Sequence, residues 1–275
     1  MSNKRYSNKG VNAAARAQAT AAAEQESKRQ TLIVCAVAAA VVLVAIVLAL
    51  VLGGVDKNTT NNSTTTATTT TSTTTTDSGE KNADMTAIKA EIDSKTVADF
   101  VETTETTEYV KLTIKHYGDV VIRLRSDIAP ITVANFQKLV GDGFYNGLTF
   151  HRIYKGFMMQ GGDPKGDGTG GSGSTIKGEF KINGVQNDLS HITGVISMAR
   201  RSTPFDSATS QFFICNADAS KSLDGSYAAF GYVVAGLDVV LTVSEVEVTA
   251  NASGENSKPV DPVYIEKICF VTPKQ

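Results

Sequence analysis

The side chains that could carry chemistry in this chain are few, and most of the motifs around them lack the context that their chemistry needs. None of the histidines has the spacing of a zinc site; they are His116, His151 and His191. Asp163 and Asp167 imitate the start of a calcium loop. However, Lys165 takes its third position, and Ser174 stands at the twelfth, where a glutamate is needed. We predict no metal site.

A glycine-rich stretch, Gly-Thr-Gly-Gly-Ser-Gly at 168–173, has the spacing of a dinucleotide-binding loop, with Asp188 about twenty residues further on. No strand pattern precedes it and no helical pattern follows, so we interpret it as a plain loop and predict no cofactor. The formal net charge of −2 is not that of a nucleic-acid-binding protein.

Hydrophobic periodicity predicts the elements that position the remaining polar side chains. From Tyr109, apolar and polar residues alternate on both sides of Gly118 and Asp119, which predicts a β-hairpin with its turn at that pair. Pro130 opens a helical stretch closed by Gly141 and Gly143, and a second helical pattern covers 237–246. Further short strands are predicted at 148–153, 157–160, 195–199, 211–215, 230–234 and 264–271. Eight strands and two helices favour a mainly β fold, a closed eight-stranded antiparallel β-barrel capped by two α-helices.

Five segments of this region resemble the signature segments of the cyclophilins, a family of peptidyl-prolyl cis-trans isomerases. They are Phe-His-Arg-Ile at 150–153, Gly-Phe-Met-Met-Gln-Gly-Gly-Asp-Pro at 156–164, Gly-Val-Ile-Ser-Met-Ala at 194–199, Ser-Gln-Phe-Phe-Ile at 210–214, and Leu-Asp-Gly at 223–225 with Phe-Gly at 230–231. They follow the family's order and resemble its compact bacterial branch. The resemblance implies one isomerase domain at 108–272, in the family's eight-stranded barrel closed by two helices.

The resemblance assigns the catalytic role to Arg152, and the chemistry agrees with it. An X–Pro bond isomerises slowly because amide resonance sets a barrier of ~18–20 kcal/mol. A cation aimed at the prolyl nitrogen favours the twisted amide, in which resonance is lost. A guanidinium has a fixed charge and a planar fork, so this reaction needs no nucleophile, cofactor or metal. The expected partners are proline-containing polypeptides.

The same resemblance implies the substrate-binding residues. An apolar bowl for the proline ring is expected from Phe157, Met158, Phe213 and Leu223. Gln160 matches the residue that hydrogen-bonds the substrate backbone, and Gln211 and Ala199 match flanking contacts.

Two positions depart from the pattern of many eukaryotic members. Ser222 stands where they have Trp before Leu-Asp-Gly, and Tyr227 stands where they have His. Tyr227 can still pack on proline and donate a hydrogen bond. We therefore expect catalysis to survive, but we expect weak binding of cyclosporin, the family's cyclic peptide inhibitor.

The N-terminal part of the chain has a different composition. Of 19 aromatic residues, 17 lie at or after Tyr109, so the core-forming capacity is concentrated there. Residues 1–31 form a basic tail, and 32–52 are 21 residues without charge, Pro or Gly. As a helix this run spans about 31 Å, enough for a bilayer core of ~30 Å. A Thr-rich linker is predicted at 53–83, and 84–107 is either linker or a short helix.

Charge asymmetry predicts the topology. The excess of Lys and Arg before the 32–52 run places the N-terminus in the cytoplasm, which makes the protein a single-pass cell-membrane protein with an extracytoplasmic isomerase domain. A cleaved signal peptide is the alternative to an anchor. The alternative to an enzyme is a non-catalytic proline-binding or surface-interaction module on a stalk. Cys215 and Cys269 are either buried thiols or a disulfide.

Overall fold

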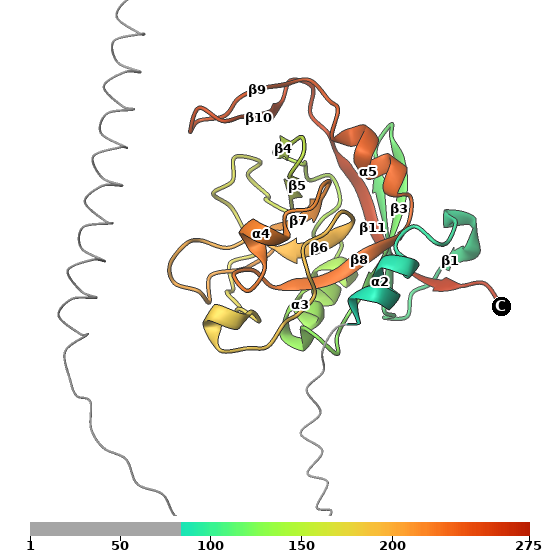
Figure 1. Cartoon of the computed structure of the whole chain (residues 1–275). Helices are drawn as coiled ribbons and strands as arrows, with labels where there is room; N and C mark the ends of the chain where they lie inside the picture. Colours follow the sequence, from blue (N-terminus) through green and yellow to red (C-terminus); the bar gives the residue numbers. More distant parts are fainter. Residues whose placement is uncertain (1–83) are drawn as a thin grey trace, which may run out of the picture. The chain divides into compact units, whose positions relative to one another are not determined.

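The computed structural model describes residues 84–275, and nine of the strands in this part form one antiparallel sheet (Figure 1). The strands are β1 (Phe100–Glu102), β2 (Tyr109–Ile114), β3 (Gly118–Leu124), β4 (Arg152–Tyr154), β5 (Met158–Gly161), β6 (Val195–Met198), β7 (Phe212–Cys215), β8 (Ala229–Ala235) and β11 (Ile265–Pro273). Their order across the sheet is β1-β11-β2-β3-β8-β6-β7-β5-β4. A separate hairpin pairs β9 (Val248–Ala250) with β10 (Asn256–Pro259).

The predicted mainly β fold is confirmed, but the predicted closed barrel of eight strands is not what the structure shows. The ladder is open, with β1 and β4 at its ends, and β1 is a ninth strand that the hydrophobic pattern did not indicate. The strand expected at 148–153 is regular only from Arg152. Upstream of it, Thr149 is shared between isolated bridges to Asp163 and Tyr264. Thr149 pairs with both segments through single bridges only. The segment before Arg152 therefore does not form a regular ladder that would close the sheet.

The β2–β3 hairpin is confirmed, but its turn was placed too late in the chain. Ile114 pairs with Gly118, so the turn consists of residues 115–117. The amide of Tyr117 donates to the carbonyl of Ile114 at 3.0 Å, and His116 takes a left-handed conformation with φ of 71°. Gly118 and Asp119 therefore belong to the strand, where Asp119 pairs with Thr113.

Four helices of the described part are α2 (Met85–Glu91), α3 (Pro130–Gly141), α4 (Ser220–Leu223) and α5 (Leu237–Val243), and short 3-10 turns lie at Val97–Asp99 and Lys181–Asn183. The two predicted helices correspond to α3 and α5. Pro130 starts α3 because its ring presets φ and its missing N–H has no partner in a first turn. Phe136 of α3 packs on Tyr145, Phe212 and Phe230 with ring centroids 5.1–5.6 Å apart, which joins the helix to the core of the sheet.

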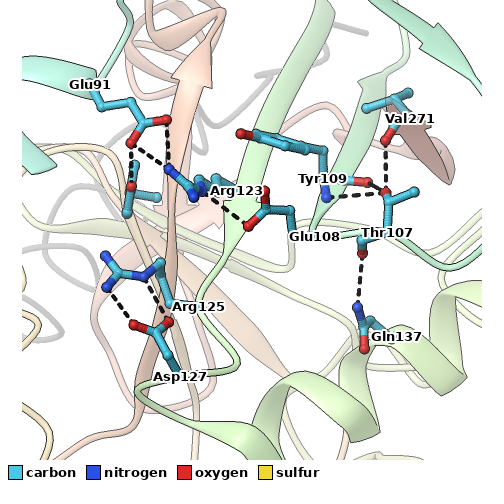
Figure 2. Close-up of polar contacts among 10 residues, drawn as sticks. Glu91, Thr107, Glu108, Tyr109, Arg123, Arg125, Asp127, Gln137 and Val271 are labelled. Atoms are coloured by element: carbon cyan, nitrogen blue, oxygen red, sulfur yellow. Dashed lines mark hydrogen bonds and ion pairs between the residues drawn. The ribbon is translucent and has the colours of Figure 1, made fainter. Parts of the chain in front are cut away.

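Residues 84–107 contain α2 and β1. Strand pairing joins β1 to β11, and charged side chains attach α2 to the sheet. Arg123 of β3 donates to both carboxylate oxygens of Glu91 in α2 at 2.9 and 3.0 Å, and to Glu108 at 3.2 Å (Figure 2). Tyr232 of β8 also donates to Glu91, at 2.6 Å. Ile88 of α2 is buried in a hydrophobic cluster that includes Tyr109 and Tyr232. The segment left open between linker and helix is thus folded against the domain.

Residues 1–83 lie outside the described part, and with them the predicted membrane span at 32–52 and the Thr-rich linker at 53–83. Between residues 84 and 275, no helix is both long enough and apolar enough to cross a membrane. Both cysteines of this part are free thiols. Cys215 lies in β7 and Cys269 in β11, and burial raises the pKa of Cys215 to about 12.

Candidate active site

Strand register places the predicted catalytic residue Arg152 and two predicted substrate-binding residues in one row across three strands. Arg152 of β4 pairs with Gln160 of β5, and Gln160 pairs with Phe213 of β7. Directly paired residues project to the same face of a sheet. Met158 lies two residues before Gln160 and therefore shares this face, since side chains alternate along a strand. Met158 pairs with Cys215 of β7, which lies two residues after Phe213.

A directed series of hydrogen bonds runs along this row. A terminal nitrogen of Arg152, Nη1, lies 3.5 Å from Oε1 of Gln160 and 3.8 Å from the sulfur of Met158. Gln160 donates through Nε2 to Oε1 of Gln211 at 2.8 Å. Gln211 in turn donates to the carbonyls of Gly168 and Gly170 at 3.0 and 2.8 Å. The two glutamine amides are therefore held in fixed orientations beside the guanidinium.

The apolar bowl predicted from the sequence is assembled next to this row. Met158, Phe213 and Leu223 form one buried cluster with Cys215 and Ala219. Its partly buried margin consists of Phe157, Ala199 and Tyr227. Tyr227 meets Phe213 edge to face, with ring centroids 5.8 Å apart. Six of the nine sequence-predicted site residues thus lie in this cluster or on its margin. The other three, Arg152, Gln160 and Gln211, are joined by the hydrogen bonds beside it.

A Ser–His–Asp arrangement, with Ser197 and His191 buried and Asp224 exposed, supports the floor of the bowl. His191 stacks on Phe213 with centroids 6.0 Å apart. Its Nδ1 lies 2.8 Å from Asp224, and its Nε2 lies 3.0 Å from the hydroxyl of Ser197. This is the order of groups found in a nucleophilic triad. Ser197 is 0% exposed on β6, however, so no substrate reaches its hydroxyl, and the three residues serve to hold Phe213 in place.

Three aromatic rings form a cage around Arg200 at the rim of the bowl, and the sequence analysis did not predict it. The guanidinium of Arg200 lies over the rings of Phe180, Phe205 and Tyr227, 4.7–5.0 Å from their centroids. Its Nε donates to the carbonyl of Ser226 at 2.8 Å. No local pattern indicates this cage, since Phe180 and Phe205 come from separate loops. Ser222 of α4 is exposed and comes immediately before Leu223 of the bowl.

Glu255 is the second residue that sequence reasoning missed, and it pairs directly with Arg152. Its carboxylate accepts from Nε of Arg152 at 2.6 Å and from Nη2 at 2.7 Å. This ion pair lowers the pKa of Glu255 to about 2. Glu255 lies in the β9–β10 hairpin, 103 residues from Arg152 along the chain, so no spacing in the sequence signals the contact.

The hairpin holds Glu255 in position. The backbone amide of Glu255 donates to the side-chain oxygen of Asn251 at 3.1 Å. The amide nitrogen of Asn251 donates to the hydroxyl of the fully buried Ser257 at 3.1 Å. Because Glu255 takes the Nε and Nη2 edge of the guanidinium, the Nη1 edge is the one that faces Gln160 and Met158.

Comparison with known proteins agrees with this geometry. Residues 109–269 match the family described as cyclophilin type peptidyl-prolyl cis-trans isomerase/CLD. Peptidyl-prolyl cis-trans isomerase B of Bacillus subtilis is 45% identical over 125 residues, which cover 46% of this chain and 82% of that protein. Peptidyl-prolyl cis-trans isomerase A of Dickeya dadantii is 40% identical over 172 residues, or 61% of this chain and 85% of that protein.

A solved structure gives the same result for the fold. The Cryptosporidium parvum cyclophilin type peptidyl-prolyl cis-trans isomerase, crystallised in the presence of the dipeptide Ala-Pro, aligns with a TM-score of 0.52 at 30% identity. The alignment covers 59% of this chain and 98% of that one. With the family match over more than half of the chain, this protein belongs to the cyclophilin family and is a peptidyl-prolyl cis-trans isomerase.

Proposed function

We propose that Arg152 is the catalytic residue and that it acts by weakening amide resonance in the X–Pro bond of a bound polypeptide. The observation that carries this proposal is the row of Arg152, Gln160 and Phe213 across β4, β5 and β7, with the apolar bowl beside it. A proline ring seated in the bowl brings its nitrogen to the side of the row that holds Nη1 of Arg152. Millisecond turnover requires an acceleration of ~10⁴–10⁵-fold, about 5.5–7 kcal/mol.

In this proposal the residues of the bowl and the two glutamines bind and orient the substrate. Met158, Phe213 and Leu223 supply the floor for the proline ring, and Phe157, Ala199 and Tyr227 supply its margin. Gln160 hydrogen-bonds the substrate backbone near the isomerising bond, and Gln211 supplies a flanking contact. Turnover of a proline peptide by the full chain, in a protease-coupled isomerisation assay, tests whether this site is active. The Arg152 variants described in the Discussion test the role of the guanidinium.

We expect Glu255 to act through Arg152 as a positioning residue. The bidentate pair restrains the guanidinium, and a small misplacement of a catalytic group is enough to reduce the rate strongly. We therefore predict that Glu255→Gln lowers kcat/KM about 10-fold. The measurement is the isomerisation assay, with Glu245→Gln as the matched control, because Glu245 forms an exposed ion pair with Lys155 instead.

A double variant separates this role from a purely structural one. If Glu255 acts through Arg152, Glu255→Gln has no further effect on kcat/KM once Arg152 is alanine, since coupled residues are not additive. A full additional 10-fold loss in that background argues for a structural role. A gain in activity from Glu255→Gln alone shows instead that the carboxylate competes with the substrate for the guanidinium.

We propose, from the sequence alone, that residues 32–52 tether the isomerase to a membrane with the domain outside the cytoplasm. The 21-residue apolar run and the basic residues before it support the proposal. Protease added to intact cells is expected to remove the domain and to leave an N-terminal tag protected. A domain that resists digestion until the cells are lysed reverses the orientation, and recovery of the domain in the medium favours a cleaved signal.

A further inference from the structure

Helix α2, teal in Figure 1, lies outside the region that matches the isomerase family and has no part in the proposed catalysis. It spans Met85–Glu91, and the family match begins at residue 109. Glu91 accepts two hydrogen bonds from Arg123 of β3 (Figure 2). After the helix, the amides of Asp93 and Lys95 donate to carbonyls of β8 at 3.3 and 3.0 Å. The position of α2 against the sheet is therefore fixed from its C-terminal side.

The start of α2 contacts the loop at 184–194, which leads into β6. The sulfur of Met85 accepts the backbone amide of Ser190 at 3.4 Å. Leu189, the neighbour of Ser190, is buried in the same hydrophobic cluster as Ile88 of α2. The helix and the loop are thus joined by a polar contact and by a shared apolar cluster.

The residue that ends α2 packs on the far end of the same loop. Ile92 is the C-cap of the helix, and one of its methyl groups lies 3.4 Å from the point where a Cβ on Gly194 would stand. Met85 and Ile92 are both partly buried at the margin of the cluster that contains Ile88. The two side chains therefore hold the loop at two separate points.

The loop in turn holds both ends of α4, the helix that carries Leu223 of the bowl. The hydroxyl of Ser190 donates to Asp224 at 2.6 Å, and the amide of His191 donates to the same carboxylate at 2.8 Å. Asp224 is the C-cap of α4. At the other end, the N-cap residue Ala219 donates its amide to the carbonyl of His191 at 2.9 Å. A shift of the loop therefore moves α4 as a whole.

His191 also connects the loop directly to the floor of the bowl, since its ring stacks on Phe213 with centroids 6.0 Å apart. Contacts thus run without a gap from Met85 through Ser190 to His191. Coupling between separate parts of a protein is carried by packed side chains and hydrogen-bond networks of this kind. The positions of α2 and of the proline bowl are therefore linked.

We propose that α2 is a positioning element of the active site, and that Met85 and Ile92 are positioning residues that fix the 184–194 loop and, through it, the proline bowl. The proposal rests on the proposed function, because it takes the bowl to be the site of the proline ring. Loss of either side chain loosens the bowl and leaves the guanidinium of Arg152 in place. The expected signature is therefore a raised KM with kcat nearly unchanged.

Kinetics of full-chain variants test the proposal. Met85→Ala and Ile92→Ala are each expected to raise KM for a proline peptide about 3- to 5-fold, with kcat within about 2-fold of the wild type. Met85→Leu keeps most of the apolar volume and is expected to restore KM. Val97→Ala is the matched control, because Val97 lies at the margin of the same cluster but in the 3-10 turn against β3. An unchanged KM in both α2 variants overturns the proposal, and so does an equal rise in Val97→Ala.

Hydrogen exchange follows the loop and α4 without relying on turnover. In Met85→Ala, but not in Val97→Ala, the amides of residues 188–193 and 219–224 are expected to exchange at least about 5-fold faster than in the wild type. Exchange of α4 at the wild-type rate overturns the proposal even if KM rises. A wild type that turns over no proline peptide contradicts the proposed function, whereas faster exchange in Met85→Ala still supports the positioning role of α2.

Discussion

Arg152→Ala is expected to lower kcat/KM at least ~100-fold while the fold stays intact, the scale observed when one preorganised charge or donor is removed from an active site. Arg152 lies in β4, the last strand of the ladder (Figure 1). Its removal takes away the Nη1 group that faces Gln160 and Met158. It leaves the bowl of Met158, Phe213 and Leu223 in place, so we expect binding of proline peptides to weaken less than turnover.

Arg152→Lys is expected to be nearly as poor, because a point charge does not reproduce the fork that grips Glu255 and reaches Gln160 at the same time. Arg152→Ala also leaves Glu255 without its partner. The double variant with Glu255→Gln controls for that unpaired charge. The measurements are the protease-coupled assay and circular dichroism. Near-normal turnover in Arg152→Ala, with an unchanged spectrum, removes Arg152 from the mechanism.

Cyclosporin is expected to inhibit this protein weakly, about 30- to 1,000-fold less tightly than a family member that has Trp before Leu-Asp-Gly. A proline ring needs only the apolar floor, whereas the bulky macrocycle also uses an indole wall and its N–H. Ser222 is exposed on α4 and supplies neither group. Loss of one buried aromatic contact and its hydrogen bond costs about 2–4 kcal/mol, which gives that range at 1.4 kcal/mol per tenfold.

Titration of the inhibitor against the wild type and Ser222→Trp in one assay measures the effect. We expect Ser222→Trp to recover part of the affinity. The gain is limited by Arg200, whose guanidinium covers Tyr227 4.7 Å from the ring centroid at the same rim. Tight inhibition of the wild type contradicts the prediction, and it means that the cage of Arg200 with Phe180, Phe205 and Tyr227 replaces the missing indole wall.

The sequence by itself determined the parts of this protein that depend on near neighbours in the chain. Alternation of apolar and polar residues located β2 and β3, and Pro130 located the start of α3, because both signals come from backbone geometry within a few residues. The motif residues of β5 and β7, among them Gln160 and Phe213, were identified from the resemblance to the family and not from periodicity. Each of these motifs overlaps one strand, and pairing of β5 with β7 brings Gln160 beside Phe213.

Tertiary structure alone decided which side chains surround those motifs. Glu255 meets Arg152 across 103 residues, from a polar hairpin whose sequence has no strand-like alternation. The cage around Arg200 combines side chains from separate loops, and β1 completes a ladder that stays open. Contacts of this kind depend on where loops return to the sheet. Loop paths are set by the packing of the whole domain, so no local pattern of residues encodes them.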